Sequence, residues 1–288
     1  MTKKATHPTK SLKIPQFIII SAKICAFIST KLVTSYAAKL FTTPIKHKIP
    51  KREFEMDSES IQKTIYVGAI DKNIVTYEYG QSDRKILLVH GWSGRGTQLF
   101  KIADELVKSE YSTISFDAPA HGKSQGKTTL MSEFILSILE IDKQYGPFEI
   151  AIGHSLGGMS VLNAIKDGLK VNKAVIIGSG DIVQDILDEF ISKLGLKAEI
   201  SERLRDRFEN KYQIKMDSFS AYRAAEKVKV PTLVIHDNDD PEVPVKAGIH
   251  IHKHLENGSL FLTDGLGHRK ILGNQNVINK IINFIKTS

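Results

Sequence analysis

The stretch Gly153-His154-Ser155-Leu156-Gly157-Gly158 reads G-x-S-x-G-G and decides the fold of this chain. The apolar residues 148–152 before it are typical of a buried strand, and residues 159–165 after it favour a helix. A serine in a sharp turn between strand and helix has strained backbone geometry. Glycines stand at positions 153 and 157 because a Cβ there would clash with the neighbouring strand and helix. The turn lifts the hydroxyl out at the end of the strand, so Ser155 is a candidate nucleophile.

Two later strand-like runs end in residues that can complete such a site. A serine hydroxyl is a poor nucleophile at neutral pH and needs a base, which in turn needs an orienting carboxylate. The run 231–236 leads into Asp237-Asn238-Asp239-Asp240-Pro241-Glu242-Val243-Pro244, and the run 259–262 leads into Thr263-Asp264-Gly265-Leu266-Gly267-His268. Ligands gather at the carboxyl ends of parallel strands. We therefore expect an acid and a base from these loops to meet Ser155 at one edge of a sheet.

Five segments of the chain together resemble the α/β-hydrolase superfamily in order and spacing. They are His90-Gly91-Trp92, Phe116-Asp117-Ala118-Pro119-Ala120-His121-Gly122-Lys123-Ser124, the serine turn, Asp240-Pro241-Glu242-Val243-Pro244 and Gly265-Leu266-Gly267-His268. The resemblance implies an α/β fold in which a mostly parallel central sheet is flanked by helices and covered by a short helical cap. It also implies a Ser-His-Asp triad that needs no metal or cofactor.

The acid and the base of that triad each have competitors. In the family the acid commonly lies three residues before a Val-Pro pair, which favours Asp240 over Asp237, the residue that ends the strand. His268 alone has the Gly-x-Gly-His setting. The histidines at 90 and 154 are ill placed as bases, because neighbours on a sharp turn point apart. The alternating histidines 250, 252 and 254 lack a nearby Cys or paired carboxylate, so a partly solvated face is favoured over a metal site.

Two backbone amides are expected to form the oxyanion hole. One belongs to Leu156, the residue after the nucleophile, and the resemblance implies that the other belongs to Trp92. Trp92 lies in a glycine-rich loop after the strand-like run 85–89, where Gly91 lets the backbone approach a ligand. The loop lacks the Gly-Lys-Ser/Thr ending of a phosphate-binding loop. Asp117 and His121 are expected to brace the site rather than to react.

Alternating elements predict a parallel sheet with helical crossovers. Residues 64–70 and 73–79 read as a hairpin turned at Asp71-Lys72. Strand-like runs follow at 85–89, 112–116, 149–152 and 173–177, and helical stretches at 99–108, 130–145 and 156–167. Residues 181–217 break the alternation with two helical pieces, 181–194 and 199–212, which form the expected cap. Its apolar stripe (Ile182, Ile186, Phe190, Leu194) either packs on the core or faces an acyl chain.

Charge is concentrated at the start of the chain. Residues 1–52, the N-terminal arm, hold eleven of the 40 Lys and Arg residues and none of the 32 Asp and Glu residues. Residues 53–288, the expected catalytic domain, are therefore not basic, which argues against nucleic acid as a partner. The single cysteine, Cys25, excludes an intrachain disulfide and fits a reducing compartment.

The arm contains an apolar segment, residues 14–28, that has four interpretations. A signal peptide and a membrane span are disfavoured because Lys23 interrupts the segment. A transit peptide is a third. We favour the fourth interpretation, an amphipathic helix that either lies on a membrane surface or packs on the domain. The pattern from Thr30 onward supports it, because Leu32, Val33, Tyr36 and Leu40 fall on one face. The expected location is cytoplasmic, with membrane contact through the arm as an alternative.

The pattern as a whole predicts a serine hydrolase that cleaves carboxylic esters through an acyl-enzyme. The same triad serves acyltransferases, thioesterases and enzymes acting on lysophospholipids or monoacylglycerols, so these remain alternatives. A ligand-binding protein on a hydrolase scaffold is an alternative of another class. The partner is then a small ester or a lipid-like molecule, and oligomeric state is left open. Deletion of residues 1–52 is expected to spare a soluble esterase.

Overall fold

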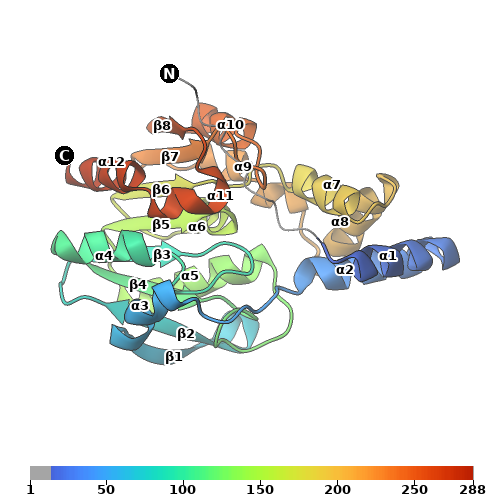
Figure 1. The fold of residues 1–288 in the computed structure, drawn as a ribbon, viewed down its shortest axis with the longest axis horizontal. Coiled ribbons are helices and arrows are strands. Elements are labelled where there is room, and N and C mark those ends of the chain that lie inside the picture. The colour runs from blue at the N-terminus through green and yellow to red at the C-terminus, as the bar shows by residue number, and fades with distance from the viewer. Residues whose placement is uncertain (1–13, 288) are drawn as a thin grey trace, which may run out of the picture.

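The computed structural model describes residues 14–287, which fold around one eight-stranded sheet (Figure 1). Its order is β1-β2-β4-β3-β5-β6-β7-β8. β2 runs antiparallel to both of its neighbours, and all the other pairs are parallel. The strands are β1 (Ile61–Val67), β2 (Lys72–Tyr79), β3 (Lys85–Val89), β4 (Ser112–Asp117), β5 (Ile150–His154), β6 (Lys173–Ile177), β7 (Thr232–Asp237) and β8 (Gly258–Thr263). The expected mostly parallel sheet is confirmed.

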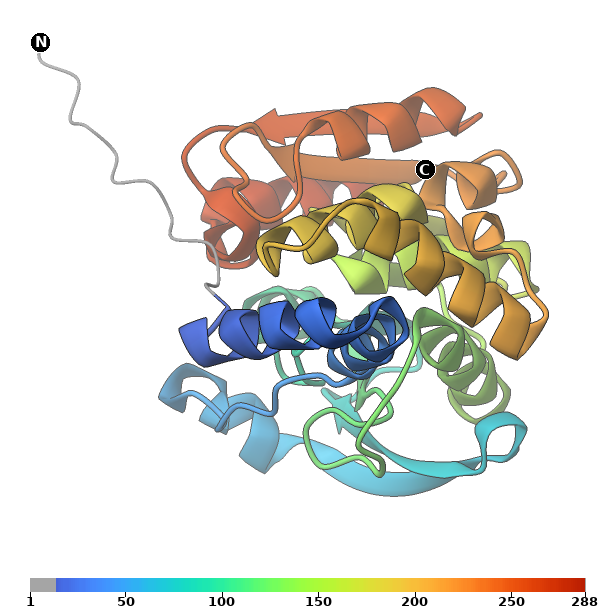
Figure 2. The same ribbon diagram turned by 90° about the vertical axis from the view of Figure 1, so that its right-hand side faces the viewer.

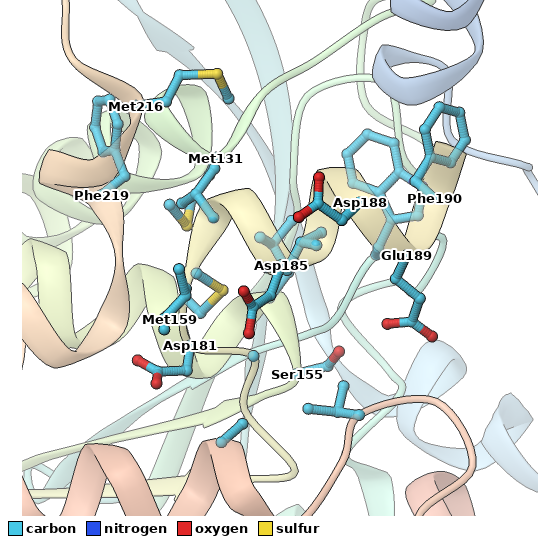
Figure 3. Close-up of a pocket in the computed structure, with 18 of the residues that line it drawn as sticks. Met131, Ser155, Met159, Asp181, Asp185, Asp188, Glu189, Phe190, Met216 and Phe219 are labelled. Carbon is cyan, nitrogen blue, oxygen red and sulfur yellow. The ribbon is translucent and has the colours of Figure 1, made fainter. Parts of the chain in front are cut away.

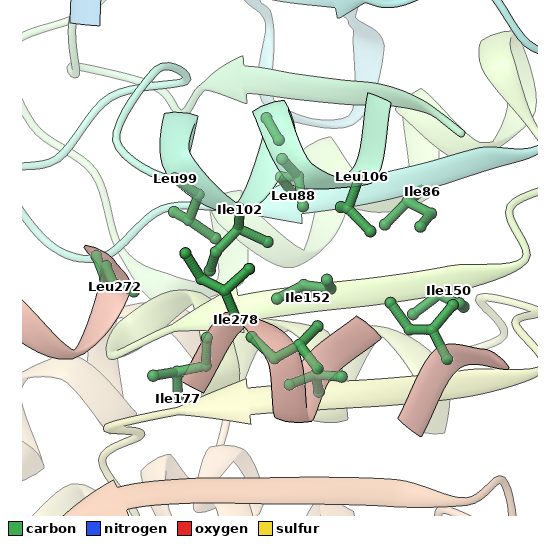
Figure 4. Close-up of a cluster of buried hydrophobic side chains, with 14 of the residues drawn as sticks. Ile86, Leu88, Leu99, Ile102, Leu106, Ile150, Ile152, Ile177, Leu272 and Ile278 are labelled. Carbon is green, nitrogen blue, oxygen red and sulfur yellow. The ribbon is translucent and has the colours of Figure 1, made fainter. Parts of the chain in front are cut away.

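Helices cover both faces of this sheet. They are α3 (Phe54–Glu59), α4 (Phe100–Lys108), α5 (Met131–Tyr145), α6 (Leu156–Lys166), α9 (Ala221–Ala225), α10 (Lys246–His254), α11 (Gly267–Lys270) and α12 (Gln275–Lys286). Successive strand side chains point to opposite faces. Ile86 and Leu88 of β3 therefore pack with α4 and α12 (Figure 4), whereas Leu87 and Val89 pack with α5 and α6. Burial on both faces explains why the parallel strands read as continuous apolar runs.

The turn of the β1–β2 hairpin differs from the expected one. The short 3₁₀ helix Gly68–Ile70 and Asp71 together make the turn, and Asp71 has a left-handed backbone with φ of 52°. Lys72 is already paired with Val67 across the hairpin. The expectation of a two-residue turn at Asp71-Lys72 was therefore wrong, because four residues rather than two reverse the chain.

The cap and residues 14–42 of the arm form a separate helical layer beside the sheet. Two cap helices, α7 (Val183–Lys193) and α8 (Glu199–Tyr212), lie between β6 and β7 in the chain. Two arm helices, α1 (Gln16–Ile28) and α2 (Thr30–Thr42), pack against them, and Figure 2 shows α1 and α2 in blue below the gold cap helices. The four helices share an apolar cluster that includes Val33 and Ala37 from the arm and Leu187 and Leu204 from the cap. We call this unit the arm–cap layer.

The buried face of α2 includes most of the face expected from the sequence, since Val33 is fully buried and Tyr36 and Leu40 pack against the same cluster. Val33, Thr34, Ala37 and Ala38 are buried against the cap, whereas the side chain of Leu32 is 42% exposed. Ala37 and Ala38 extend the buried face, because small residues let two helices approach closely. Among residues 14–287, no helix combines the length and the hydropathy needed to cross a membrane.

Candidate active site

Ser155 lies in the turn between β5 and α6, with a left-handed φ of 55°. A Cβ at Gly153 would collide with the backbone carbonyl of Gly157. A Cβ at Gly157 would collide with the carbonyl of Val89 at the end of β3. The absence of both side chains lets strand, helix and neighbouring strand meet at this point. On the opposite side a Cβ at Gly91 would come within 2.9 Å of the Ser155 Cβ, so the glycine-rich loop reaches the serine closely.

Asp240 and His268 form a buried hydrogen-bonded pair. The Nδ1 of His268 lies 2.7 Å from Oδ2 of Asp240. Oδ1 of the same carboxylate accepts the backbone N–H groups of Glu242 at 2.8 Å and Val243 at 2.9 Å. Burial acts to raise the pKa of Asp240, but the hydrogen bonds from His268 and the two amides outweigh it, and the pKa lies below its ordinary value. Asp240 is therefore a carboxylate aimed at one ring nitrogen of His268.

Asp237, the competing acid, holds the loop that carries the histidine. Its carboxylate accepts four hydrogen bonds: from the N–H of Asp239, the hydroxyl of Thr263, and the N–H groups of Leu266 and Gly267, at distances from 2.7 to 3.1 Å. Both oxygens are occupied and fully buried. The structure thus pairs His268 with Asp240 and uses Asp237 to fix the backbone just before His268.

The end of β6 joins the serine to the Asp–His pair. The N–H of Ser155 donates to the carbonyl of Ile177 at 2.9 Å. At the next residue, Gly178, a Cβ would lie 3.3 Å from Nδ1 of His268 and 3.5 Å from Oδ2 of Asp240. Two successive residues at the end of β6 therefore hold the backbone of Ser155 and lie beside the Asp240–His268 pair. The three candidates from three loops meet at one edge of the sheet.

Two more histidines flank the pair and are held neutral. The Nε2 of His154 donates to the backbone carbonyl of His268 at 2.9 Å, and the two rings lie 4.7 Å apart. The Nε2 of His236 donates to the carbonyl of Val243 at 3.0 Å and lies 3.6 Å from Asp240. Burial lowers the pKa of His154 well below its usual value and also lowers that of His236. Sequence reasoning set His154 aside as a base but missed that it and His236 hold the loops of the pair in place.

The glycine-rich loop after β3 is braced from the loop after β4. The N–H of Ser93 donates to Nε2 of His121, and the N–H of Gly96 donates to the Asp117 carboxylate at 2.7 Å. In return, Nε2 of His90 accepts the N–H of Ala118 at 3.0 Å. Burial lowers the pKa of His90 to about 4 and that of His121 to about 3, so both rings stay neutral and can accept these bonds. The backbone around Trp92 is thereby held in place.

A cavity of about 1020 Å³ opens over Ser155. Trp92 and Leu156, the two expected oxyanion donors, line it beside the serine. The remaining wall is mostly apolar, and Figure 3 shows Met159 and Phe190 around the same space. Its apolar lining residues are Leu40, Phe41, Met131, Met159, Ile182, Ile186, Phe190, Phe208, Met216 and Phe219. The cavity is therefore suited to an apolar group attached near the serine.

The cap stripe and the arm both contribute to that wall. Ile182, Ile186 and Phe190 face the cavity, whereas Leu194 is buried in the cluster between arm and cap. From the arm, the Phe41 ring lies 5.2 Å from the Phe190 ring and 5.9 Å from the Phe208 ring. Sequence reasoning missed Phe41, because nothing local to a basic arm indicates that its second helix folds back over the site.

The alternating histidines lie on α10, and His250 among them lines the cavity. His250 Nδ1 lies 2.5 Å from Oδ2 of Asp181, and Nδ1 of His254 donates to the carbonyl of His250. Burial raises the pKa of Asp181. Within residues 14–287 no group of His, Cys, Asp and Glu side chains is arranged to hold a metal ion.

Comparison with known proteins places this geometry in context. The model of the family described as "Alpha/beta hydrolase family" matches residues 86–275. The uncharacterized hydrolase YugF of Bacillus subtilis is 24% identical over 248 aligned positions, which cover 69% of this chain and 89% of that protein. An esterase of Pyrococcus furiosus superposes with a TM-score of 0.64 at 18% identity, over 85% of this chain and 97% of its own. A membrane phospholipase A superposes with a TM-score of 0.63 at 15% identity, over 94% and 97%.

Proposed function

We propose that this chain, which belongs to the alpha/beta hydrolase family, is a serine hydrolase. Its proposed substrates are carboxylic esters with apolar acyl groups. The observation that carries the proposal is the position of Ser155 on a strained turn, at the floor of an apolar cavity and beside the buried Asp240–His268 pair. The names of two structural neighbours, an esterase and a phospholipase A, support ester bonds as the target class.

In this proposal Ser155 attacks the ester carbonyl and His268 takes the serine proton. Because Nδ1 of His268 faces the carboxylate of Asp240, the free Nε2 is the proton acceptor, and the carboxylate stabilises the imidazolium that forms. The backbone amides of Trp92 and Leu156 hold the developing oxyanion. His268 then gives its proton to the leaving alcohol. In the second half it activates a water molecule, which releases the carboxylic acid from Ser155.

The neighbours of His268 support its role as the base. His154 and His236 use Nε2 as donors to backbone carbonyls, and burial keeps both rings neutral, so neither places a positive charge beside His268. A protonated neighbour would make protonation of His268 harder, because like charges repel. The site is thereby arranged so that the proton from Ser155 goes to one histidine.

The test is hydrolysis of nitrophenyl esters from acetate to palmitate by the natural chain and by Ser155→Ala. We expect turnover that rises with acyl length and then falls when the chain exceeds the cavity, and a loss of about 10⁴-fold or more in the variant. Ser160→Ala is the matched control, since Ser160 lies on the same helix and bonds only to the carbonyl of Leu156. Turnover retained in a folded Ser155→Ala variant would rule out the proposed nucleophile.

A further inference from the structure

Helix α1 carries a stripe of large apolar side chains that the rest of the structure leaves uncovered. Phe27 is 94% exposed, Phe17 69%, Ile28 65%, Ile24 55% and Ile20 50%. Isolated exposed apolar residues are ordinary on a protein surface, but contiguous ones mark an interaction site. The five residues of this stripe lie within one 13-residue helix.

The stripe forms a single face of the helix. At 100° per residue, positions 17, 20, 24, 27 and 28 fall within about 100° of arc, and Ala22, the buried residue of α1, lies opposite them. Ala22 packs into the cluster with the cap, and the aliphatic part of Lys23 packs near Gly195 in the turn between α7 and α8. One side of α1 is thus fixed to the protein, and the other points outward. In Figure 1 α1 extends to the end of the molecule away from α4 and α12.

The arm that carries this apolar face is positively charged. Lys23 on α1 and Lys31 and Lys39 on α2 are exposed, and the whole arm contains no acidic residue. Helix α8, which packs against α2, carries as many basic as acidic residues, and Glu199 pairs with Arg203 and Asp206 with Arg205. On α7, Glu189 pairs with Lys193 and Asp185 with Lys246. An exposed apolar helix face on a basic arm is suited to the interface of an anionic membrane, which offers both an apolar interior and negative charge.

We propose that the exposed face of α1 docks on an anionic lipid surface, with the helix lying parallel to the membrane. The following helix α2 supplies Leu40 and Phe41 to the cavity wall, so the docked enzyme holds its acyl cavity close to the lipid. If the proposed function is correct, the substrate is then an ester with a lipid-like acyl chain. The docking itself does not depend on that function.

Charge favours lipid over a second copy of this chain as the occupant of the face. A symmetric dimer would place the same patch of each subunit against the other. The two arms, each with eleven basic residues and no acidic residue, would then repel one another. An anionic bilayer supplies the opposite charge together with an apolar interior for the two phenylalanines and three isoleucines.

The experiment measures sedimentation of the full chain with vesicles, in a Ser155→Ala background so that no lipid is consumed. Vesicles of phosphatidylcholine with phosphatidylglycerol are compared with vesicles of phosphatidylcholine alone. We expect at least about tenfold stronger partitioning to the anionic vesicles, lost at high salt. Ile24→Ser/Phe27→Ser should weaken it by at least about tenfold. Phe54→Ser/Ile61→Ser is the matched control, because it removes one exposed phenylalanine and one exposed isoleucine elsewhere, and should bind as the parent does.

Three results would overturn the docking proposal: no partitioning to anionic vesicles, equal losses in the two double variants, or a dimer in sedimentation velocity that Ile24→Ser/Phe27→Ser abolishes. A second assay, hydrolysis of a water-soluble acetate ester by the natural chain with Ser155 intact, distinguishes failure of the docking proposal from failure of the proposed function. Ester turnover without vesicle binding refutes docking alone. Vesicle binding without any ester turnover refutes the hydrolase alone.

Discussion

The edge of the sheet that carries Ser155 and the arm–cap layer above it are built by different means. At the sheet edge, hydrogen bonds and missing side chains fix each loop: Asp237 accepts four hydrogen bonds, and Gly157 leaves room for the Val89 carbonyl. In the arm–cap layer, apolar side chains such as Val33 and Leu204 interdigitate around one cluster. Hydrogen bonds at the sheet edge specify the positions of individual atoms, whereas apolar packing in the arm–cap layer specifies the volume and shape of the space between helices.

This difference assigns the two regions separate tasks. A hydrogen-bonded edge tolerates few substitutions, because each lost partner leaves a buried polar group unsatisfied. An apolar layer tolerates exchanges of similar size at small cost. We therefore expect the sheet edge to determine the reaction and the arm–cap layer to determine which substrates fit and where the enzyme resides.

The largest effect should separate the two acids of the sheet edge. Asp240→Asn keeps an oxygen for the amides of Glu242 and Val243 but presents an amide to His268, so we expect kcat to fall by about 10³–10⁴-fold with little change in stability. Asp237→Asn brings an NH₂ group against N–H donors, so the free energy of unfolding should fall by about 2–4 kcal/mol. Ester kinetics and urea unfolding on both variants provide the measurement.

The reverse pattern would contradict the assignment of these two carboxylates. If Asp237→Asn lost turnover while remaining as stable as the parent, and Asp240→Asn kept its activity, then the acid that serves His268 would be Asp237. Comparable losses of stability in both variants would instead indicate that neither aspartate has a role beyond holding its loop.

The site at the sheet edge was largely predictable because its chemistry is local in sequence. A strained serine turn needs glycines at fixed spacing, and the loops after β7 and β8 carry acids and a histidine where strand ends converge. The bounds of β3 and β6 match the expected runs 85–89 and 173–177, since doubly buried strands are uninterrupted apolar runs. The choice between Asp237 and Asp240 rested on family resemblance, because both are loop acids and only tertiary contacts distinguish them.

The arm–cap layer was less predictable because its contacts join segments distant in the chain. The sequence shows that α2 is amphipathic, but burial of Ala37 and Ala38 depends on how closely α8 approaches. For the same reason the cavity contact of Phe41 has no local signal. The structure also changes the expectation for deletion of residues 1–52: removal would uncover Leu187 and Leu204 of the cap, so we now expect loss of stability rather than an intact esterase.

A smaller effect should appear when the arm's share of the cavity wall is reduced. Phe41→Ala removes a ring that contacts Phe190 and Phe208, so kcat/KM should fall by about tenfold for long acyl esters and stay unchanged for acetate. Phe54→Ala is the matched control, since Phe54 is exposed and distant from the cavity wall. Equal losses for acetate and long esters would show that Phe41 supports the fold and does not select the acyl chain.

A further effect concerns acid stability, which should arise at the sheet edge. His90 and His121 have folded pKa values of about 4 and about 3, below the usual value near 6.5. The unfolded chain therefore binds more protons, and stability that is complete above about pH 6.5 falls as the pH is lowered, by up to about 1.4 kcal/mol per pH unit for each histidine. Helices α1, α2, α7 and α8 contain no histidine, so no histidine of the arm–cap layer contributes to this loss of stability.

Urea unfolding at pH 7, 6 and 5 measures this slope. His121→Gln keeps an acceptor for the N–H of Ser93 but cannot be protonated, so its stability should depend less steeply on pH than that of the natural chain. An identical pH dependence in the two proteins would show that His121 is not a source of the acid sensitivity.

The central claim, that the sheet edge makes Ser155 a nucleophile, is tested most directly by covalent labelling. A fluorophosphonate reacts with a serine only when a base and an oxyanion hole activate it. We predict that the natural chain gains one label on the peptide containing Ser155, that Ser155→Ala gains none, and that Asp240→Asn reacts at least about a hundredfold more slowly. A folded natural chain that takes up no label, or a label that persists in Ser155→Ala, would contradict the account.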